Sequence, residues 1–400
     1  MSWPVDFFNG FIGQFSAFLQ PYPSVNYMEK VWFAIKDDQL IDTPALVVYH
    51  ERVQHNIAAM VRLAGAPDRL IPHVKTYKMA EIVQLQLAAG IRKFKAATIA
   101  EAEMVALAGG TFVLIAHQLV GPKAERLAQL QAKYPQVQFA SLVDCPEMAA
   151  HLDQTLAQHQ LTAQVFVDVN NAMDRSGHPV DPALFAFYQS LADRAAYPHL
   201  HCAGLHVYDG NFRQSDFTER KRAIDAAFDP VETLVDQIVA AGLPQPMVVC
   251  GGTPAFTAHA QRKGVHCSPG TCLLSDWGYG ESLPEQPFEW AALLLTRIIS
   301  KPKPGYLTLD LGHKAVAAEN PLDKRVKFLN LDDYQVISQS EEHLVLAVDD
   351  WDRYQVGQLF YGVPYHICPT VNLYNEVSVV ENGAIVGQWP VVARNRKLTV

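Results

Sequence analysis

The sequence has few of the features that mark secreted or membrane proteins. Its 400 residues include only six cysteines, and none forms a C-x-x-C pair, so we expect reduced thiols rather than a disulfide framework. No run of about 18 apolar residues, the length of a membrane span, occurs. The apolar N-terminal stretch lacks the preceding Lys or Arg that a secretory signal requires. These absences predict a cytoplasmic protein with no membrane partner.

Positive charge is scarce as well. Lys and Arg number 32 against 41 Asp and Glu, which gives a net charge of -9. Proteins that bind nucleic acid or anionic membranes need a basic face, so this charge argues against both partners. A small anion is compatible with it, because one helix terminus or glycine loop can hold an anion locally. We therefore expect a small-molecule ligand.

The sequence does contain a regular alternation of two patterns between residues 45 and 262. Short β-branched or apolar runs are each followed by an amphipathic helical pattern. Eight such units in about 220 residues predict a closed (β/α)8 barrel of the TIM type, since an open doubly wound sheet usually has about five or six strands. The predicted strands are Ala45–Tyr49, Leu70–Thr76, Lys93–Thr98, Thr111–Ala116, Val137–Val143, Ala163–Val169, Cys202–Val207 and Met247–Gly251.

After residue 285 the pattern changes to short strands separated by Pro and Gly turns, which predicts a smaller, mostly antiparallel β domain. Its predicted strands are Trp290–Ser300, Gly305–Leu311, His343–Val348, Gln358–Phe360 and Val377–Val380. We therefore predict that the chain has three parts. Residues 1–44 pack on the β domain or on a dimer partner, residues 45–285 form the barrel, and residues 286–400 form the β domain.

Lys75 ends the predicted second strand, Leu70–Thr76. In a barrel the carboxyl ends of the strands form the active-site rim. Apolar neighbours desolvate an amine there, which suits Schiff-base formation. An ordinary lysine that points to solvent fits the position equally well. Lys78 is the nearest alternative, but it is predicted to begin a helix and to face water.

The run Pro72-His73-Val74-Lys75-Thr76, in a barrel followed by a β domain, resembles the D-threonine aldolase and D-serine dehydratase family. These proteins have the alanine-racemase-like fold of pyridoxal-phosphate enzymes. The resemblance extends from about Ile41 to the C-terminus. It implies that pyridoxal 5'-phosphate is the cofactor, that Lys75 carries it as a Schiff base and serves as the catalytic base, and that the protein is a homodimer.

Two glycine-containing loops are candidate phosphate sites. Gly251, Gly252 and Thr253 follow the predicted eighth strand, where glycines let backbone N–H groups approach an anion. In barrels a phosphate usually binds beside the seventh and eighth strands. Gly270 and Thr271 resemble a second family element that completes the phosphate site, although Thr271 could equally cap a turn.

Two barrel strands offer groups for the cofactor ring. His206 and Tyr208 alternate at the end of the predicted seventh strand, so both point to the same side. Tyr208 is predicted to contact the cofactor and His206 to be catalytic, with a hydrogen-bonded core histidine as the alternative. Arg175 lies in an R-x-G pattern similar to the family's, near the cofactor face. A structural ion pair between Arg175 and Asp168 is the alternative.

His366 and Cys368 are the candidate metal ligands. Side chains two residues apart in a strand point the same way, so His366 and Cys368 can bind one metal together. The resemblance implies a divalent metal here, beside the β-hydroxyl of the substrate. Imidazole and thiolate favour zinc over manganese or magnesium. Family members that cleave the Cα–Cβ bond typically have H-x-D at these positions, whereas dehydratases have H-x-C.

The resemblance therefore implies a metal-assisted lyase that acts on β-hydroxy-D-amino acids. The H-x-C pair favours a D-serine or D-threonine type dehydratase, which releases a keto acid and ammonia; the alternative is cleavage to glycine and an aldehyde. An amino-acid racemase would need a second base, such as Tyr361, Tyr365 or Tyr374, and would not need the metal. A non-catalytic pyridoxal-phosphate carrier usually lacks the β domain.

Overall fold

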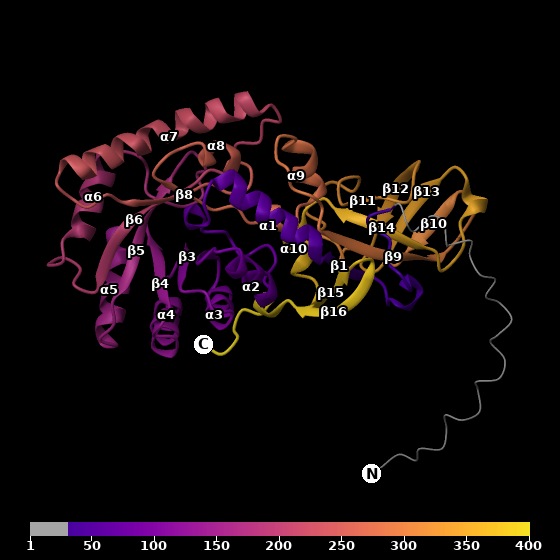
Figure 1. Ribbon diagram of the computed structural model, residues 1–400, viewed down its shortest axis with the longest axis horizontal. Coiled ribbons are helices and arrows are strands. Elements are labelled where there is room, and N and C mark those ends of the chain that lie inside the picture. The colour runs from indigo at the N-terminus through magenta and orange to yellow at the C-terminus, as the bar shows by residue number, and fades with distance from the viewer. Residues whose placement is uncertain (1–30) are drawn as a thin grey trace, which may run out of the picture.

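The computed structural model describes residues 31–400, which form two units built on two sheets (Figure 1). The first unit is a parallel sheet surrounded by helices, and the second is a mostly antiparallel sheet. The predicted α/β barrel with a smaller β domain is confirmed. Within residues 31–400, no helix is long and apolar enough to cross a bilayer.

Seven strands of the barrel lie in sequence order, each parallel to the next. They are β2 (Lys93–Ala96), β3 (Phe112–Gln118), β4 (Gln138–Val143), β5 (Ala163–Asn170), β6 (Leu200–Tyr208), β7 (Met247–Cys250) and β8 (Val265–Cys267). The segment from Leu70 to Val74 takes the eighth place. It bridges β8 through Leu70 and Cys267, and β2 through His73 and Lys95. The barrel therefore closes.

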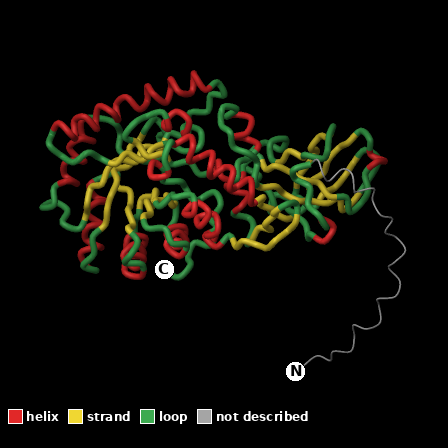
Figure 2. Tube along the Cα trace, in the orientation of Figure 1, coloured by secondary structure: helices red, strands yellow, loops and turns green. Residues whose placement is uncertain are grey.

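The helices surround the barrel strands, which gather at the centre of the unit (Figure 2). Local sequence explains several of their starts: proline is at the first position of α4, α5 and α6, and side chains of Thr98, Asp181 and Asp216 cap α3, α6 and α7. Their bounds are α1 (His50–Ala64), α2 (Ala80–Ala88), α3 (Ile99–Leu107), α4 (Pro122–Lys133), α5 (Pro146–Gln158), α6 (Pro182–Ala192), α7 (Phe217–Ala240) and α8 (Phe256–Ala260).

The barrel has the predicted eight strand positions, but one predicted strand does not belong to it and one true strand was not predicted. Ala45–Tyr49, called β1, pairs with β9 (Ala292–Ser300) and β15 (Glu376–Glu381) of the second sheet, not with the barrel. A short buried apolar run fits either sheet, so its pattern alone cannot assign it. The three-residue strand β8 was too short to recognise. Lys75 therefore follows the first barrel strand, which is a bridged segment rather than a full strand, and the Gly251-Gly252 loop follows the seventh.

The β domain is a nine-stranded sheet around β9 (Ala292–Ser300). Its one parallel pair joins β1, which precedes the barrel in the sequence, to β15, which follows it. The short or polar strands β11, β12 and β16 were not predicted. The remaining bounds are β10 (Tyr306–Leu309), β11 (Val326–Phe328), β12 (Tyr334–Gln339), β13 (Leu344–Val348), β14 (Leu359–Pro364), β15 (Glu376–Glu381) and β16 (Ala384–Pro390).

The two units share one apolar core. A single cluster of buried side chains runs from Leu46 and Val48 in β1 to barrel residues such as Phe94 and to Phe360 in β14. Helix α1 links the units in Figure 1, and its buried Asn56 donates to the backbone oxygens of Leu273 and Glu289. The barrel and the β domain therefore hold each other in position.

Residues 31–44 pack against the β domain. Ile35 is fully buried, and its N–H donates to the Tyr361 hydroxyl over 3.3 Å. The Arg297 guanidinium donates to the Asp38 carbonyl over 2.7 Å. The prediction made for the rest of the N-terminal segment concerns residues 1–30, which lie outside the described residues.

Replacing Gly204 in β6 by alanine tests the barrel register. An added Cβ would lie 1.9 Å from the Met247 carbonyl oxygen in β7, and this backbone atom cannot rotate away. We expect Gly204→Ala to lower the free energy of unfolding by about 3 kcal/mol, measured by chemical denaturation. Gly387→Ala, whose Cβ would meet no atom within 4 Å, should change it by less than about 0.5 kcal/mol. Equal stability of the two variants would contradict the register.

Candidate active site

Lys75 lies at the carboxyl-end rim of the barrel. It is half-buried, and its amine is 5.8 Å from the centre of the Tyr208 ring in β6. The rival Lys78 does not begin a helix, because α2 starts at Ala80. Lys78 instead pairs with the fully buried carboxylate of Glu101. Of the two lysines, Lys75 has the amine that faces the other predicted site residues.

The Tyr208 ring forms one wall of the site. The Arg175 guanidinium lies 4.7 Å from its centre, so Arg175 contacts Tyr208 and forms no ion pair with Asp168 within the described chain. The ring also lies against the loop after β7, where a Cβ on Gly252 would be 3.0 Å from it. Arg175, Tyr208 and Gly252 are thus brought together with Lys75, as the cofactor-site prediction requires.

His206 lies below Tyr208 on the same side of β6 and is buried. Its Nδ1 is 2.7 Å from Asp168 Oδ1, and Asp168 also accepts hydrogen bonds from Gln118 and Ser176. Burial lowers the pKa of His206, although Asp168 opposes this effect. The imidazole is therefore neutral near pH 7, with Nδ1–H donating to Asp168 and Nε2 free to accept. This is the geometry of a hydrogen-bonded core histidine that also lines the site.

The two glycine loops lie side by side at the ends of β7 and β8. Thr253 joins them, because its Oγ1 accepts from the N–H of Gly270 over 3.3 Å and of Cys272 over 3.4 Å. Gly251 has a φ of 74°, which only glycine adopts easily, and a Cβ on Gly270 would lie 2.5 Å from the His73 carbonyl oxygen. This backbone cradle fits the phosphate of pyridoxal phosphate, with Lys75 close by.

The His366 and Cys368 pair forms in a different way from the prediction. The two residues are not in a strand: β14 ends at Pro364, and His366 is the residue just before the short helix α10 (Ile367–Val371). The side chains still meet at this turn. Burial alone would raise the pKa of the Cys368 thiol, but hydrogen bonds from His366, Thr271 and Thr76 outweigh burial and lower it. The pKa of His366 is correspondingly raised to about 9.

Residues around this turn complete the arrangement. The Glu319 carboxylate is 2.6 Å from His366 Nδ1, which leaves Nε2 to face a ligand. Buried Asp276 accepts from the Ile367 N–H over 3.1 Å and so fixes the backbone between His366 and Cys368. Neither Glu319 nor Asp276 was predicted, because each is far from the pair in sequence. In the sequence, only its acidic side chain marks Glu319 as a candidate partner of a metal-binding histidine.

The donor set fits zinc. A thiolate and an imidazole are zinc ligands, and metal-bound histidine almost always gives its other nitrogen to a carboxylate, as His366 does to Glu319. Within residues 31–400, no group of three or more His, Cys, Asp or Glu side chains is placed to hold a metal. His366 and Cys368 would supply two ligands, one fewer than the three protein ligands usual in catalytic zinc sites, and substrate or water would fill the other positions.

Thr76 and Thr271 connect the metal pair to the cofactor site. The Thr76 hydroxyl lies 3.1 Å from Cys368 Sγ, and the Thr271 hydroxyl lies 3.3 Å from it. Thr271 was predicted to contact the phosphate or to cap a turn. It follows Gly270 in a short 3-10 turn, and its hydroxyl faces Thr76 and Cys368. Lys75 is the sequence neighbour of Thr76, so the barrel rim that carries Lys75 also contacts the thiol of Cys368.

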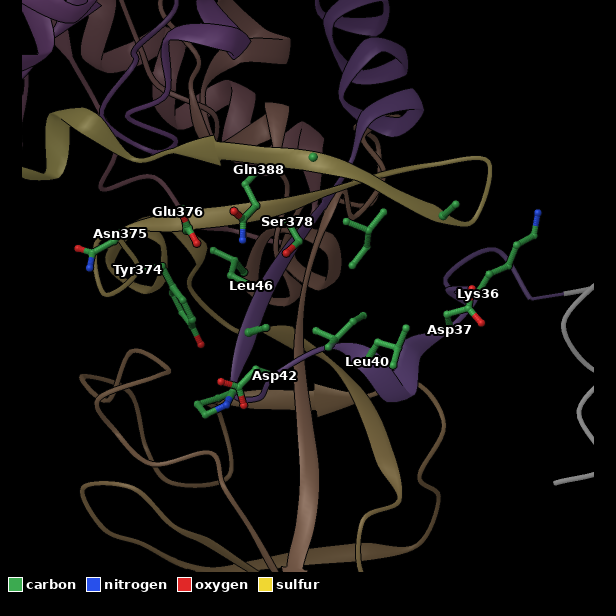
Figure 3. A pocket seen from close by; sticks show the side chains of 16 residues that line it. Lys36, Asp37, Leu40, Asp42, Leu46, Tyr374, Asn375, Glu376, Ser378 and Gln388 are labelled. Atoms are coloured by element: carbon green, nitrogen blue, oxygen red, sulfur yellow. The ribbon is translucent and has the colours of Figure 1, made fainter. Parts of the chain in front are cut away.

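A separate pocket lies in the β domain. Figure 3 shows it between residues 36–46 and strands β15 and β16, with Asp42 and Glu376 among its lining side chains. None of the predicted cofactor or metal residues lines this pocket, although Tyr374, a candidate racemase base, does. Because neither Lys75 nor the metal pair lies in it, we assign no chemistry to it.

Two family models match the chain. The model described as alanine racemase, N-terminal domain, matches residues 48–276, and the model described as putative serine dehydratase domain matches residues 291–380. The first covers the barrel and more than half of the chain, and the second covers most of the β domain. This division follows the two sheets of the structure.

Several known proteins are similar to this chain in sequence or in structure. The 3-hydroxy-D-aspartate aldolase of Paracoccus denitrificans (strain Pd 1222) is 29% identical over 375 residues, which cover 90% of this chain and 94% of that protein. The D-threo-3-hydroxyaspartate dehydratase of Delftia sp. (strain HT23) is 30% identical over 233 residues, or 56% of this chain and 59% of that protein. The crystal structure of D-threonine aldolase from Filomicrobium marinum has a TM-score of 0.82 at 26% identity and covers 91% of this chain and 98% of that chain. This protein therefore belongs to the alanine-racemase-like family, and its predicted resemblance to the D-threonine aldolases and D-serine dehydratases is confirmed.

Proposed function

We propose that this protein is a pyridoxal-phosphate-dependent, metal-assisted lyase that dehydrates β-hydroxy-D-amino acids to a keto acid and ammonia. One observation carries the proposal: the Thr76 hydroxyl lies 3.1 Å from Cys368 Sγ, so the lysine-bearing rim of the barrel touches the metal pair. A substrate held at Lys75 would have its β-carbon beside His366 and Cys368. The lyase class is supported by the relatives, which are named aldolases and dehydratases.

Each part of the site has a distinct task. When bound, pyridoxal phosphate supplies an electron sink for the α-carbon, and the metal supplies a Lewis acid for the β-oxygen. The Lys75 amine takes the α-proton, because it lies at the rim where the substrate enters. The backbone at Gly251, Gly252 and Gly270 holds the phosphate. His366 and Cys368 hold the metal, and the Arg175 guanidinium attracts a carboxylate of the substrate or an oxygen of the cofactor.

The residues at the metal position favour dehydration. Dehydration needs a group that draws electrons from the β-hydroxyl as it leaves, and a zinc ion on imidazole and thiolate meets this need. Aldol cleavage needs a base for the β-hydroxyl proton instead. Aldol cleavage is the second candidate, because two relatives whose sequences align with about nine-tenths of this chain are named 3-hydroxy-D-aspartate aldolase and D-threonine aldolase.

The racemase alternative loses two of its three candidate bases. The Tyr361 hydroxyl donates to the Asp38 carboxylate over 3.1 Å, between the β domain and the N-terminal segment packed against it. The Tyr374 hydroxyl donates to the Ala315 carbonyl over 2.8 Å. Both hydroxyls are engaged away from Lys75, so neither is placed to act on the α-carbon. The homodimer and the cytoplasmic location stay predictions.

Product analysis tests the proposal. We expect the protein loaded with pyridoxal phosphate and zinc to convert D-threo-3-hydroxyaspartate, D-serine or D-threonine into a keto acid and ammonia. Lys75→Ala should abolish both this activity and the visible absorbance of the bound cofactor, because no other residue anchors it. Lys123→Ala, which changes an exposed lysine of α4, should retain both. Glycine plus an aldehyde would establish the second candidate, and a fully active Lys75→Ala would refute the site.

Glu319→Gln tests the metal pair. The amide cannot hold His366 as a carboxylate does, so zinc affinity should fall by about 10- to 100-fold, as measured by competition with a chromogenic chelator. Glu341→Gln is the matched control, because Glu341 is an exposed carboxylate of the same domain that pairs with Lys314. Equal zinc affinity in the two variants would contradict the proposal that Glu319 holds His366 as a zinc ligand.

A further inference from the structure

A second lysine lies inside the active site, and the proposed mechanism does not use it. Lys95 is in β2, where only 1% of its surface is exposed. Lys95 is bridged to His73 of the neighbouring barrel segment. His73 comes two residues before Lys75 in the sequence. Lysine is almost never fully buried unless its charge is paired. Its position therefore needs an explanation.

The protein gives the Lys95 amine little to bind. Its one hydrogen-bond partner within residues 31–400 is His206 Nε2, at 3.5 Å, and it forms no ion pair with a carboxylate there. An amine has three positions for hydrogen bonds, so the buried amine of Lys95 lacks partners. Burial and, after it, the charge of Lys75 lower the pKa of Lys95 to about 7, although Cys250, Asp168 and Asp209 oppose the shift.

The Lys95 amine lies near the Tyr208 ring, which forms one wall of the site. The Lys95 Nζ is 5.8 Å from the centre of the Tyr208 ring, the same distance as the Lys75 Nζ. The Arg175 guanidinium faces the same ring. Lys75 and Arg175 approach from the rim, whereas Lys95 rises from the interior of the barrel. The chain Asp168–His206–Lys95 fixes the direction of approach.

We propose that Lys95 is a cofactor-contact residue whose amine hydrogen-bonds from the barrel floor to an electron-rich atom on the edge of the pyridine ring, its nitrogen or its phenolic oxygen. The inference rests on the proposed function, because it requires pyridoxal phosphate on Lys75. His206 and Asp168 are positioning residues: they orient the Lys95 amine and do not touch the ring. Lys95 thereby adjusts the electron distribution of the ring that receives the electron pair.

The test is a titration of the bound cofactor. The groups that face Lys95 are Lys75, His73, Asp168, Arg175, His206, Tyr208, Asp209 and Cys250. Burial lowers the pKa of His73 and of His206, so both imidazoles lose their protons at a lower pH than usual. We expect the visible absorption band of the wild-type holoprotein to change with a midpoint near pH 7, where Lys95 loses its proton.

Two variants and a control separate the outcomes. Lys95→Met should remove the pH-dependent change in absorption. It should also raise the dissociation constant for pyridoxal phosphate about tenfold, because it removes a hydrogen bond to a charged group. Lys95→Gln should keep most of the affinity and still lack the transition, because an amide donates but does not titrate. Lys93→Met changes the same residue type two positions earlier in β2, at the far end from the site, and should resemble the wild type.

The contrary results are distinct. If the Lys95 variants bind pyridoxal phosphate as the wild type does and keep the transition, the inference is wrong and the proposed function stands. If the wild-type protein does not bind pyridoxal phosphate, both are wrong. Circular dichroism of the variants without cofactor identifies any loss of fold, and Lys95→Gln provides the decisive titration if Lys95→Met does not fold.

Discussion

The closure of the barrel by residues 70–74 is the constraint on which the rest of the site depends. This segment is too irregular to count as a full strand, yet its backbone bonds to β8 on one side and to β2 on the other. The N–H of Ile71 donates to Cys267, and the N–H of Val74 donates to Lys95, each over 2.9 Å. Because both edges are bonded, Lys75 emerges at a fixed point beside the glycine loops. Without the closure, neither the phosphate cradle nor Lys95 would face it.

The second constraint is the joint between the barrel and the β domain. Cys368 belongs to the β domain, but its sulfur contacts the hydroxyls of Thr76 and Thr271, which belong to the barrel. Asp276, at the end of the barrel, holds the backbone of Ile367. The shared apolar core and the parallel pairing of β1 with β15 keep the two units in register. The proposed reaction divides in the same way: the barrel acts at the α-carbon, and the β domain acts at the β-carbon.

The sequence was informative where chemistry and local pattern coincide. Tyr208 and the glycines of the two loops could be located from strand periodicity and backbone freedom, whereas the role predicted for Lys75 came from the family resemblance and not from its position alone. The identity of the first barrel strand could not, since the apolar run of β1 fits either sheet. His366 and Cys368 were predicted as a pair on the wrong premise: they meet at a turn before α10, where strand periodicity does not apply. Lys95 was overlooked because a lysine within a strand pattern gives no sign that its amine is buried; only the register with His73 and the contact with His206 reveal it.

The central claim is that one site contains both an anchor lysine for pyridoxal phosphate and a two-residue metal pair. A crystal structure of the protein loaded with pyridoxal phosphate and zinc, with anomalous diffraction at the zinc edge, tests this claim most directly. The account predicts cofactor density continuous with the Lys75 side chain and a zinc peak shared by His366 and Cys368. Cofactor density that joins another lysine, or a zinc peak away from this pair, would contradict it.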